Sequence, residues 1–360
     1  MFSVCCRLLW VILFGAGCFV PVSFAQGTAP AGPARPSAVT RVATFKGVQV
    51  TGVTVSSTGR IFACFPRWRE GIPFSVVEVM QNGTYRPYPD EQANGWEMGR
   101  KLESGRFVAV QSVLAHGKYL YVLDTMNPLW RGVVATPRVY VFDLNSNKLA
   151  RVYPLYSVTK KNSYVNDLRV DDKNGKIYFT DSGEPGLIVL DTRTGTAVRV
   201  LDNHPYTRAE VNHLNFKGKR TPFRVHADGI ALDTRRNILY FHALSGYTLY
   251  GIPTSALLLG GVTEKEVITV RTPAPDGMTF DAAGRLYMSD LESGKIVYLT
   301  FSENGKAQIR TLLEGEDVKW ADTFSIHDGW LYYTNSRIDE VGKNGVRDME
   351  FSINRVRLPN

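Results

Sequence analysis

The stretch Asp228-Gly-Ile-Ala-Leu-Asp233, followed by Ile238-Leu-Tyr-Phe241, decides the fold because the chain repeats it. A second copy reads Asp276-Gly-Met-Thr-Phe-Asp281 and continues with Arg285-Leu-Tyr-Met288, and a third copy begins at Asn166. Each copy has a polar residue, an aspartate five residues later, a turn, and then a short strand that contains an aromatic residue. A repeat of this kind is typical of stacked units that share one core.

Three weaker copies in the same register begin at Thr51, Gln111 and Asp322, and successive copies are 46 to 62 residues apart. That length suits a four-stranded blade, so six copies predict an all-β, six-bladed β-propeller. The run Val39–Phe45 precedes the first copy and has no hairpin partner. We expect this N-terminal strand to pair into the last blade and close the ring, because an open edge would leave backbone groups unpaired. A sandwich or a barrel would not explain six copies in one register.

The first residues are typical of an export signal, which we assign to residues 1–25. Arg7 provides the positive charge, Leu8–Val22 is an apolar run too short to span a bilayer, and cleavage is expected after Ala25. A lipid anchor at Cys18 is the alternative. Residues 26–38 are rich in Pro, Ala and Gly and predict a disordered leader, which leaves 39–360 as the propeller domain. We therefore expect a secreted or periplasmic protein without a membrane span.

Cysteine content and charge narrow the function classes. After removal of the signal only Cys64 would remain, so an internal disulfide is excluded, and its apolar neighbours predict a buried core thiol. The formal net charge is +8, but the basic residues are scattered and show no aromatic–basic alternation. Nucleic acid is therefore not an expected partner. We expect a monomer that binds a small molecule.

The first strand of each propeller blade lines the central channel, so the six starting residues should form a ring. Each of them carries a side-chain oxygen: Thr51, Gln111, Asn166, Asp228, Asp276 and Asp322. Three converging carboxylates raise one another's pKa unless a cation or hydrogen bonds offset the repulsion. Oxygen donors suit Ca²⁺ or another hard divalent cation, with Asn166, Asp228 and Asp276 as the predicted ligands.

The alternative is that each Asp-Gly pair serves its own turn, with the carboxylate accepting backbone N–H groups. Turn chemistry would not select Gln111 and Thr51, so the set of six favours a site. No Gly-rich phosphate loop or zinc signature is present, and we expect neither a nucleotide nor a redox cofactor. Six other aspartates, which lie beside strand turns, are interpreted as turn residues: Asp124, Asp171, Asp181, Asp233, Asp281 and Asp290.

Residues two positions before the ring should point to the same side of the strand, nearer the mouth. Tyr164 and Trp320 are therefore predicted to form a pocket rim, and His226 is a candidate general acid or base. The alternative for His226 is a hydrogen bond to a neighbouring loop. The long segments 81–106 and 202–224 are of the length that often forms functional lids, although some such segments are only insertions.

Several motifs together resemble the yellow / major royal jelly protein family. Ile61–Trp68 ends in Pro-Arg-Trp, the signature that this family shows. Matching segments follow at 110–112, 121–125, 166–168, 180–183 and 226–229, and the resemblance extends from about residue 41 to residue 358. It implies a secreted six-bladed propeller, bacterial in type and related to L-dopachrome tautomerases. Members of the family range from a dopachrome-converting isomerase to proteins with pigmentation, amine-binding and nutritional roles.

A more distant similarity is to the SMP-30/gluconolactonase group. This similarity implies a channel metal held by a Glu, two Asn or similar residues, and an Asp that also acts as a base. Asn166, Asp228 and Asp276 fall on the last three of these positions. Thr51 occupies the Glu position, and Asp228 stands where Asn is usual. Both departures weaken the lactonase interpretation.

Three hypotheses follow for the function. The first is an exported protein that acts on or binds a small cyclic or aromatic metabolite, as an isomerase if Asp276 or His226 moves a proton. The second is a divalent-metal-dependent sugar-lactone hydrolase in which Asp276 is the base. The third is a propeller that binds a ligand without catalysis.

Overall fold

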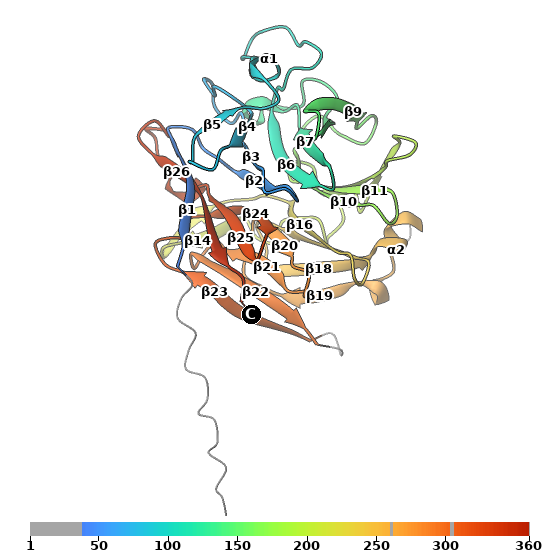
Figure 1. The fold of residues 1–360 in the computed structure, drawn as a ribbon. Coiled ribbons are helices and arrows are strands. Elements are labelled where there is room, and N and C mark those ends of the chain that lie inside the picture. The colour runs from blue at the N-terminus through green and yellow to red at the C-terminus, as the bar shows by residue number, and fades with distance from the viewer. Residues whose placement is uncertain (1–37, 260–261, 303–305, 360) are drawn as a thin grey trace, which may run out of the picture. The chain divides into compact units, whose positions relative to one another are not determined.

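The computed structural model describes residues 38–259, 262–302 and 306–359, and its strands form six four-stranded antiparallel sheets arranged as blades (Figure 1). Five blades are built from strands that are consecutive in the chain. They consist of β2 (Gly52–Val55), β3 (Ile61–Cys64), β4 (Val76–Val79) and β5 (Tyr85–Pro87); β6 (Val110–His116), β7 (Tyr119–Asp124), β8 (Arg138–Asp143) and β9 (Lys148–Pro154); β10 (Val165–Asp171), β11 (Lys176–Asp181), β12 (Gly186–Asp191) and β13 (Ala197–Val200); β16 (Ala227–Asp233), β17 (Ile238–Ala243), β18 (Thr248–Pro253) and β19 (Ile268–Arg271); and β20 (Met278–Phe280), β21 (Leu286–Asp290), β22 (Lys295–Phe301) and β23 (Ala307–Glu314).

The sixth blade joins the two ends of the described chain. It consists of β24 (Ala321–His327), β25 (Trp330–Asn335), β26 (Glu350–Arg357) and β1 (Thr40–Lys46). β1 pairs antiparallel with β26, and Phe45 lies opposite Phe351. The sequence prediction of a six-bladed propeller closed by an N-terminal strand is therefore confirmed.

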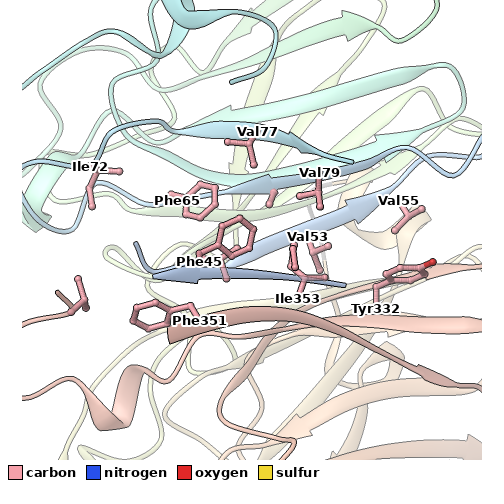
Figure 2. Packing of buried hydrophobic residues seen from close by; sticks show 14 residues of the cluster. Phe45, Val53, Val55, Phe65, Ile72, Val77, Val79, Tyr332, Phe351 and Ile353 are labelled. Atoms are coloured by element: carbon pink, nitrogen blue, oxygen red, sulfur yellow. The ribbon is translucent and has the colours of Figure 1, made fainter. Parts of the chain in front are cut away.

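The closure is also a packed core, which Figure 2 shows from close by. Phe45 from β1 and Ile353 from β26 contact Val53 and Val77 of the first blade within one buried cluster. The rings of Phe45 and Phe65 meet edge to face, with their centroids 5.0 Å apart. Removing this much apolar surface from water is the main force that holds the sixth blade against the first.

A separate hairpin between the third and fourth blades, β14 (His213–Phe216) with β15 (Lys219–Pro222), occupies the long segment 202–224. It reaches the loops of the fifth and sixth blades: the Asn215 backbone N–H donates to Glu292 Oε1 at 2.6 Å, and Lys217 Nζ lies 2.9 Å from Glu340 Oε1. The hairpin therefore extends to the same face as the beginnings of the inner strands.

Helices are few and short in the described residues. The two α-helices are α1 (Glu91–Asn94) and α2 (Thr254–Leu259). No helix in the described part of the chain has the length and apolar character needed to cross a membrane. The predicted signal segment 1–25 lies outside the described residues, as does the predicted leader except for its last residue.

Candidate functional site

A cavity of about 340 Å³ opens where the inner strands begin. Five of the six predicted ring residues line it: Gln111, Asn166, Asp228, Asp276 and Asp322. The rest of its described wall is largely aromatic and aliphatic and contains one arginine: Trp68, Trp130, Phe223, Arg224, Val225, Leu244, Trp320 and Ile338. Thr51 is buried and is not one of these lining residues, and its carbonyl accepts a hydrogen bond from Thr334 Oγ1 at 2.9 Å.

Backbone irregularities position most of the ring. In four blades the pairing of the first and second strands shifts register at the ring residue, between Val110 and Ser112, Val165 and Leu168, Ala227 and Ile230, and Ala321 and Phe324. Such bulges take a side chain out of the regular alternation of a strand and re-aim it. Thr51 and Asp276 instead lie just before β2 and β20. The ring residues at the four bulges all line the cavity.

Gly229 and Gly277 follow two of the ring aspartates and let neighbouring inner strands approach closely. A Cβ on Gly229 would collide with the Asp276 carbonyl, and one on Gly277 would collide with the Asp322 carbonyl. Only glycine fits such positions. The hydrogen bonds that the Asp228 and Asp276 carboxyls accept come from side chains, as described below. The Asp-Gly pairs therefore serve strand packing and the cavity, and the alternative of simple turn residues does not hold for these two positions.

The amide half of the ring forms a hydrogen-bonded chain across the second and third blades. Tyr164 Oη donates to Gln111 Oε1 at 2.7 Å, and Gln111 Nε2 donates to Asn166 Oδ1 at 3.1 Å. Asn166 Nδ2 then donates to Asp228 Oδ2 at 2.6 Å and to Ser182 Oγ at 2.8 Å. Each amide both donates and accepts, so its polar atoms are matched without a change of protonation.

The acidic half of the ring continues this chain into the fourth and fifth blades. Asp228 Oδ2 also accepts from Ser182 Oγ at 2.9 Å. The side chains of Asp228 and Asp276 are in hydrogen-bonding contact with each other, and Trp320 Nε1 donates to Asp276 Oδ2 at 2.6 Å. Two carboxyl groups can share such a contact only when one of them carries a proton. A proton shared between Asp228 and Asp276 would satisfy this contact.

Burial raises the pKa of all three ring carboxyls. For Asp228 burial raises the pKa to about 7, although the hydrogen bonds from Ser182 and Asn166 favour its ionised form. Burial, followed by repulsion from Asp322 and Asp228, raises the pKa of Asp276 well above its ordinary range. The pKa of Asp322 is raised in the same way, by burial and then by Asp228. The three buried carboxyls therefore hold protons to a higher pH than aspartates in water do.

The predicted rim residues have different places in the site. Trp320 lines the cavity, as expected. Tyr164 is only 1% exposed and lies behind the wall, where its ring stacks on Trp130 with centroids 3.5 Å apart and an angle of 7°. Its hydroxyl accepts a hydrogen bond from Trp68 Nε1 at 2.6 Å. Tyr164 therefore supports the two tryptophans that form the wall.

The loop that carries Trp130 has an unusual backbone. Leu129 and Trp130 have φ angles of 60° and 56°, in the left-handed region that residues other than glycine seldom adopt. The Leu129 backbone N–H donates to the Arg67 carbonyl at 2.8 Å, which ties the loop to the segment that precedes Trp68. Backbone strain of this kind concentrates at binding and active sites. Here it places an indole that is 46% exposed at the cavity wall.

His226 is not one of the residues that line the cavity in the described structure. Its Nδ1 accepts a hydrogen bond from the Ala209 backbone N–H at 2.9 Å, which is the loop contact that the sequence left as an alternative. Burial, followed by the charge of Arg224, lowers the pKa of His226. Its role as a general acid or base stays a prediction.

The six aspartates interpreted as turn residues each accept backbone N–H groups in the structure: Asp124, Asp171, Asp181, Asp233, Asp281 and Asp290. That interpretation is confirmed. Cys64 is buried, its Sγ lies 3.4 Å from the Gln111 carbonyl, and burial raises its pKa. It is a core thiol, as predicted.

In the part of the chain that the structure describes, no group of three or more His, Cys, Asp or Glu side chains is arranged to hold a metal ion. The three predicted ligands Asn166, Asp228 and Asp276 are adjacent in the hydrogen-bonded chain, and Asn166 Oδ1 is bonded to Gln111. Calcium binding stays a prediction.

Sequence reasoning missed the aromatic wall and the serine behind Asp228. Trp68, Trp130 and Phe223 come from loops outside the repeat, so the register of the repeat does not point to them. Ser182 follows β11, within the segment 180–183 that resembles a family motif. Two signals pointed to the wall: the Pro-Arg-Trp motif that ends at Trp68, and the length of the segment 202–224, which contains Phe223.

These observations define a class of protein: a six-bladed β-propeller with a hydrogen-bonded polar ring and an aromatic wall around its central cavity. A family model described as Major royal jelly protein matches residues 118–359. This match covers more than half of the chain, and the protein belongs to the major royal jelly protein family. The resemblance seen in the sequence is confirmed.

The chain is similar to two curated relatives from Drosophila melanogaster. Protein yellow is 28% identical over 221 residues, which cover 55% of this chain and 40% of that protein. Dopaminechrome tautomerase is 22% identical over 225 residues, which cover 55% of this chain and 46% of that protein. The chain thus spans less than half the length of these curated relatives.

Solved structures show the same fold. A luciferin-regenerating enzyme superposes with a TM-score of 0.58 at 12% identity, covering 89% of this chain and 95% of that one. A gluconolactonase from Xanthomonas campestris superposes with a TM-score of 0.51 at 14% identity, covering 92% of this chain and 99% of that one. At these identities the similarity concerns the fold alone.

Proposed function

We propose that this protein is an isomerase that moves a proton within a small aromatic or quinone-like ring bound in the central cavity. The observation that carries the proposal is the contact between Asp228 and Asp276, two carboxyls that line the cavity and whose pKa values burial raises. A tautomerisation removes a proton from one atom of the substrate and adds a proton to another. It therefore needs a base and an acid together, but no oxidant or reductant.

The pair can supply both roles at once. Asp228 is the base: with a pKa of about 7 it is substantially ionised at neutral pH, and Asn166 and Ser182 hold its oxygen in place. Asp276 is the acid, because its raised pKa keeps it protonated under the same conditions. The base takes a proton from a ring carbon, the acid gives one to a ring oxygen, and transfer between the two carboxyls restores the starting state. A catalytic group works best when its pKa lies near the working pH.

The aromatic wall is suited to a flat substrate. Trp68 and Trp130 lie on one side of the described wall, and Phe223 and Trp320 pack against each other with ring centroids 5.6 Å apart. Rings prefer offset-stacked or edge-to-face contacts, which these indoles offer to a planar ligand. The volume of about 340 Å³ is at the lower end of the range for small-molecule sites. A fused two-ring substrate is the size class that we expect.

The similarity to dopaminechrome tautomerase supports this reaction class, since that protein is named for an isomerase activity on a quinone-like ring. The test is to mix the purified protein with dopaminechrome and follow loss of its visible absorbance against the uncatalysed rate. We expect saturable acceleration that a chelator does not change. Turnover that requires an added divalent ion, or hydrolysis of sugar lactones, would favour the lactonase hypothesis instead. Tight binding without turnover would favour a ligand-binding propeller.

We also propose that the protein is exported. The support is the charged and apolar pattern of residues 1–25 together with the family assignment. Sequencing the N-terminus of protein produced with its own leader tests this, and cleavage before Gln26 is the expected result. Retention of the whole segment in the cytoplasmic fraction would contradict it.

A further inference from the structure

Arg224 is the one cationic side chain among the described residues that line the cavity. It is the second residue after β15 and lies between Phe223 and Val225, which also belong to the wall. Arg224 is exposed, and within the described structure its guanidinium makes no ion pair or hydrogen bond with the protein. Its positive charge nevertheless acts on a nearby residue, because it lowers the pKa of His226.

Three other basic residues of the same part of the chain have protein partners. Arg208 donates from Nε to Asn203 Oδ1 at 2.8 Å, and Lys217 pairs with Glu340. Arg199 lies 3.0 Å from Asp181 and 2.6 Å from Asp202. These residues stabilise loops, whereas Arg224 has no such role. A guanidinium that faces a cavity without a protein partner is suited to bind a carboxylate of a ligand, because its fork matches the two oxygens.

The cavity is therefore electrically asymmetric. The ionisable carboxyls of Asp228, Asp276 and Asp322 lie at the ring, and the positive charge of Arg224 lies on the hairpin side of the wall. An anionic substituent is repelled by ionised Asp228 and attracted to Arg224. A substrate with one carboxylate would thus bind in a single orientation, with the carboxylate at Arg224 and the reactive ring at the carboxyl pair.

We propose that Arg224 selects and orients substrates that carry a carboxylate on their ring system. This inference rests on the proposed tautomerase function and names the substrate class for the same cavity. It predicts that dopachrome, which has a ring carboxylate, is preferred over dopaminechrome, which lacks it. Because Arg224 is exposed, the preference is expected to be modest, roughly fivefold in KM.

The test compares the two substrates in wild-type protein, Arg224→Met and Arg224→Lys. Methionine keeps the apolar stem and removes the charge. We expect Arg224→Met to raise KM for dopachrome roughly fivefold and to leave KM for dopaminechrome unchanged, with partial rescue by lysine. High salt should reduce the wild-type preference, since exposed ionic contacts are screened. Arg208→Met is the matched control, because it removes an exposed charge that also lowers the pKa of His226 without lining the cavity.

Binding of unreactive probes separates this inference from the proposed reaction. Indole-2-carboxylate should bind wild-type protein more tightly than indole does in isothermal titration calorimetry, and Arg224→Met should abolish the difference. If neither chromogen is turned over but this binding preference holds, the tautomerase proposal fails and the role of Arg224 in anion recognition stands. Equal weakening for both probes, or the same loss in Arg208→Met, would overturn the inference.

Discussion

The two halves of the central ring occupy equivalent backbone positions but have different chemistry. On one side, Gln111 and Asn166 satisfy each other through matched donors and acceptors. On the other side, Asp228 and Asp276 contact each other through groups that have no donor unless one is protonated. The propeller frame brings both sets to one cavity. The comparison teaches that residue identity at a repeated position, and not the fold, decides which side of the ring can hold a transferable proton.

Replacing a carboxyl of the acidic half should have the largest effect on the rate of turnover. In Asp276→Asn the side chain can still accept the hydrogen bond from Trp320 but cannot transfer a proton. We expect the rate of chromogen turnover to fall about 100- to 1000-fold, measured as kcat by absorbance. Asp290→Asn is the control, because Asp290 accepts the Ser293 backbone N–H in a turn and asparagine can do the same. Equal loss in both variants would contradict a special role for Asp276.

The acidic half should also make stability depend on pH. Because the folded pKa of Asp228 is raised to about 7, the native state binds more protons than the unfolded state between about pH 4 and pH 7. Stability is therefore fully present below the unfolded pKa and is lost as the pH rises through 7. We expect Asp228 to account for a fall in the free energy of unfolding on the order of 2 kcal/mol between pH 5 and pH 8 in urea titrations. Asp228→Asn should make the pH dependence shallower, while the raised pKa values of Asp276 and Asp322 leave a remaining slope. An unchanged slope in that variant would argue against the raised pKa of Asp228.

A substitution in the amide half should change the pH dependence of turnover without abolishing turnover. Asn166→Ala removes the 2.6 Å hydrogen bond that favours ionised Asp228, so the pKa of Asp228 should rise. The ascending limb of the pH–rate profile should move upward by about one pH unit. Gln111→Ala is the comparison, because Gln111 reaches Asp228 only through Asn166. Identical shifts in the two variants would contradict the order of the hydrogen-bonded chain.

Substitutions in the aromatic wall should have the smallest effect on turnover. They also test whether the two halves of the ring have different roles. Trp130 stacks on Tyr164 beside the amide half, and Trp320 donates to Asp276 in the acidic half. Trp130→Ala should raise KM about fivefold with little change in melting temperature, because the indole is 46% exposed. Trp320→Phe should lower kcat instead. Steady-state measurement of KM and kcat for both variants checks this. A lower kcat in Trp130→Ala would contradict the assignment of Trp130 to binding and of Trp320 to the reaction.

The repeat was enough to predict the blades and five of the six ring residues that line the cavity, because period and register are properties of the strands themselves. Thr51 has the same register but is not one of the lining residues. The wall could not be predicted in this way. Trp130 reaches the cavity through a loop with left-handed backbone at Leu129, and Phe223 arrives on a hairpin inserted between blades. Neither loop has a counterpart in the repeat. Tyr164 was expected at the rim and is instead buried, because Trp130 stacks over it.

The protonation of the carboxyl pair can be measured directly by carbon-13 NMR of the aspartate carboxyl groups across pH 4 to 9. The account predicts one carboxyl that titrates near pH 7, absent in Asp228→Asn, and two others, Asp276 and Asp322, that keep their protons to higher pH. If every aspartate in the folded protein is already ionised at pH 5, there is no proton between Asp228 and Asp276 to transfer.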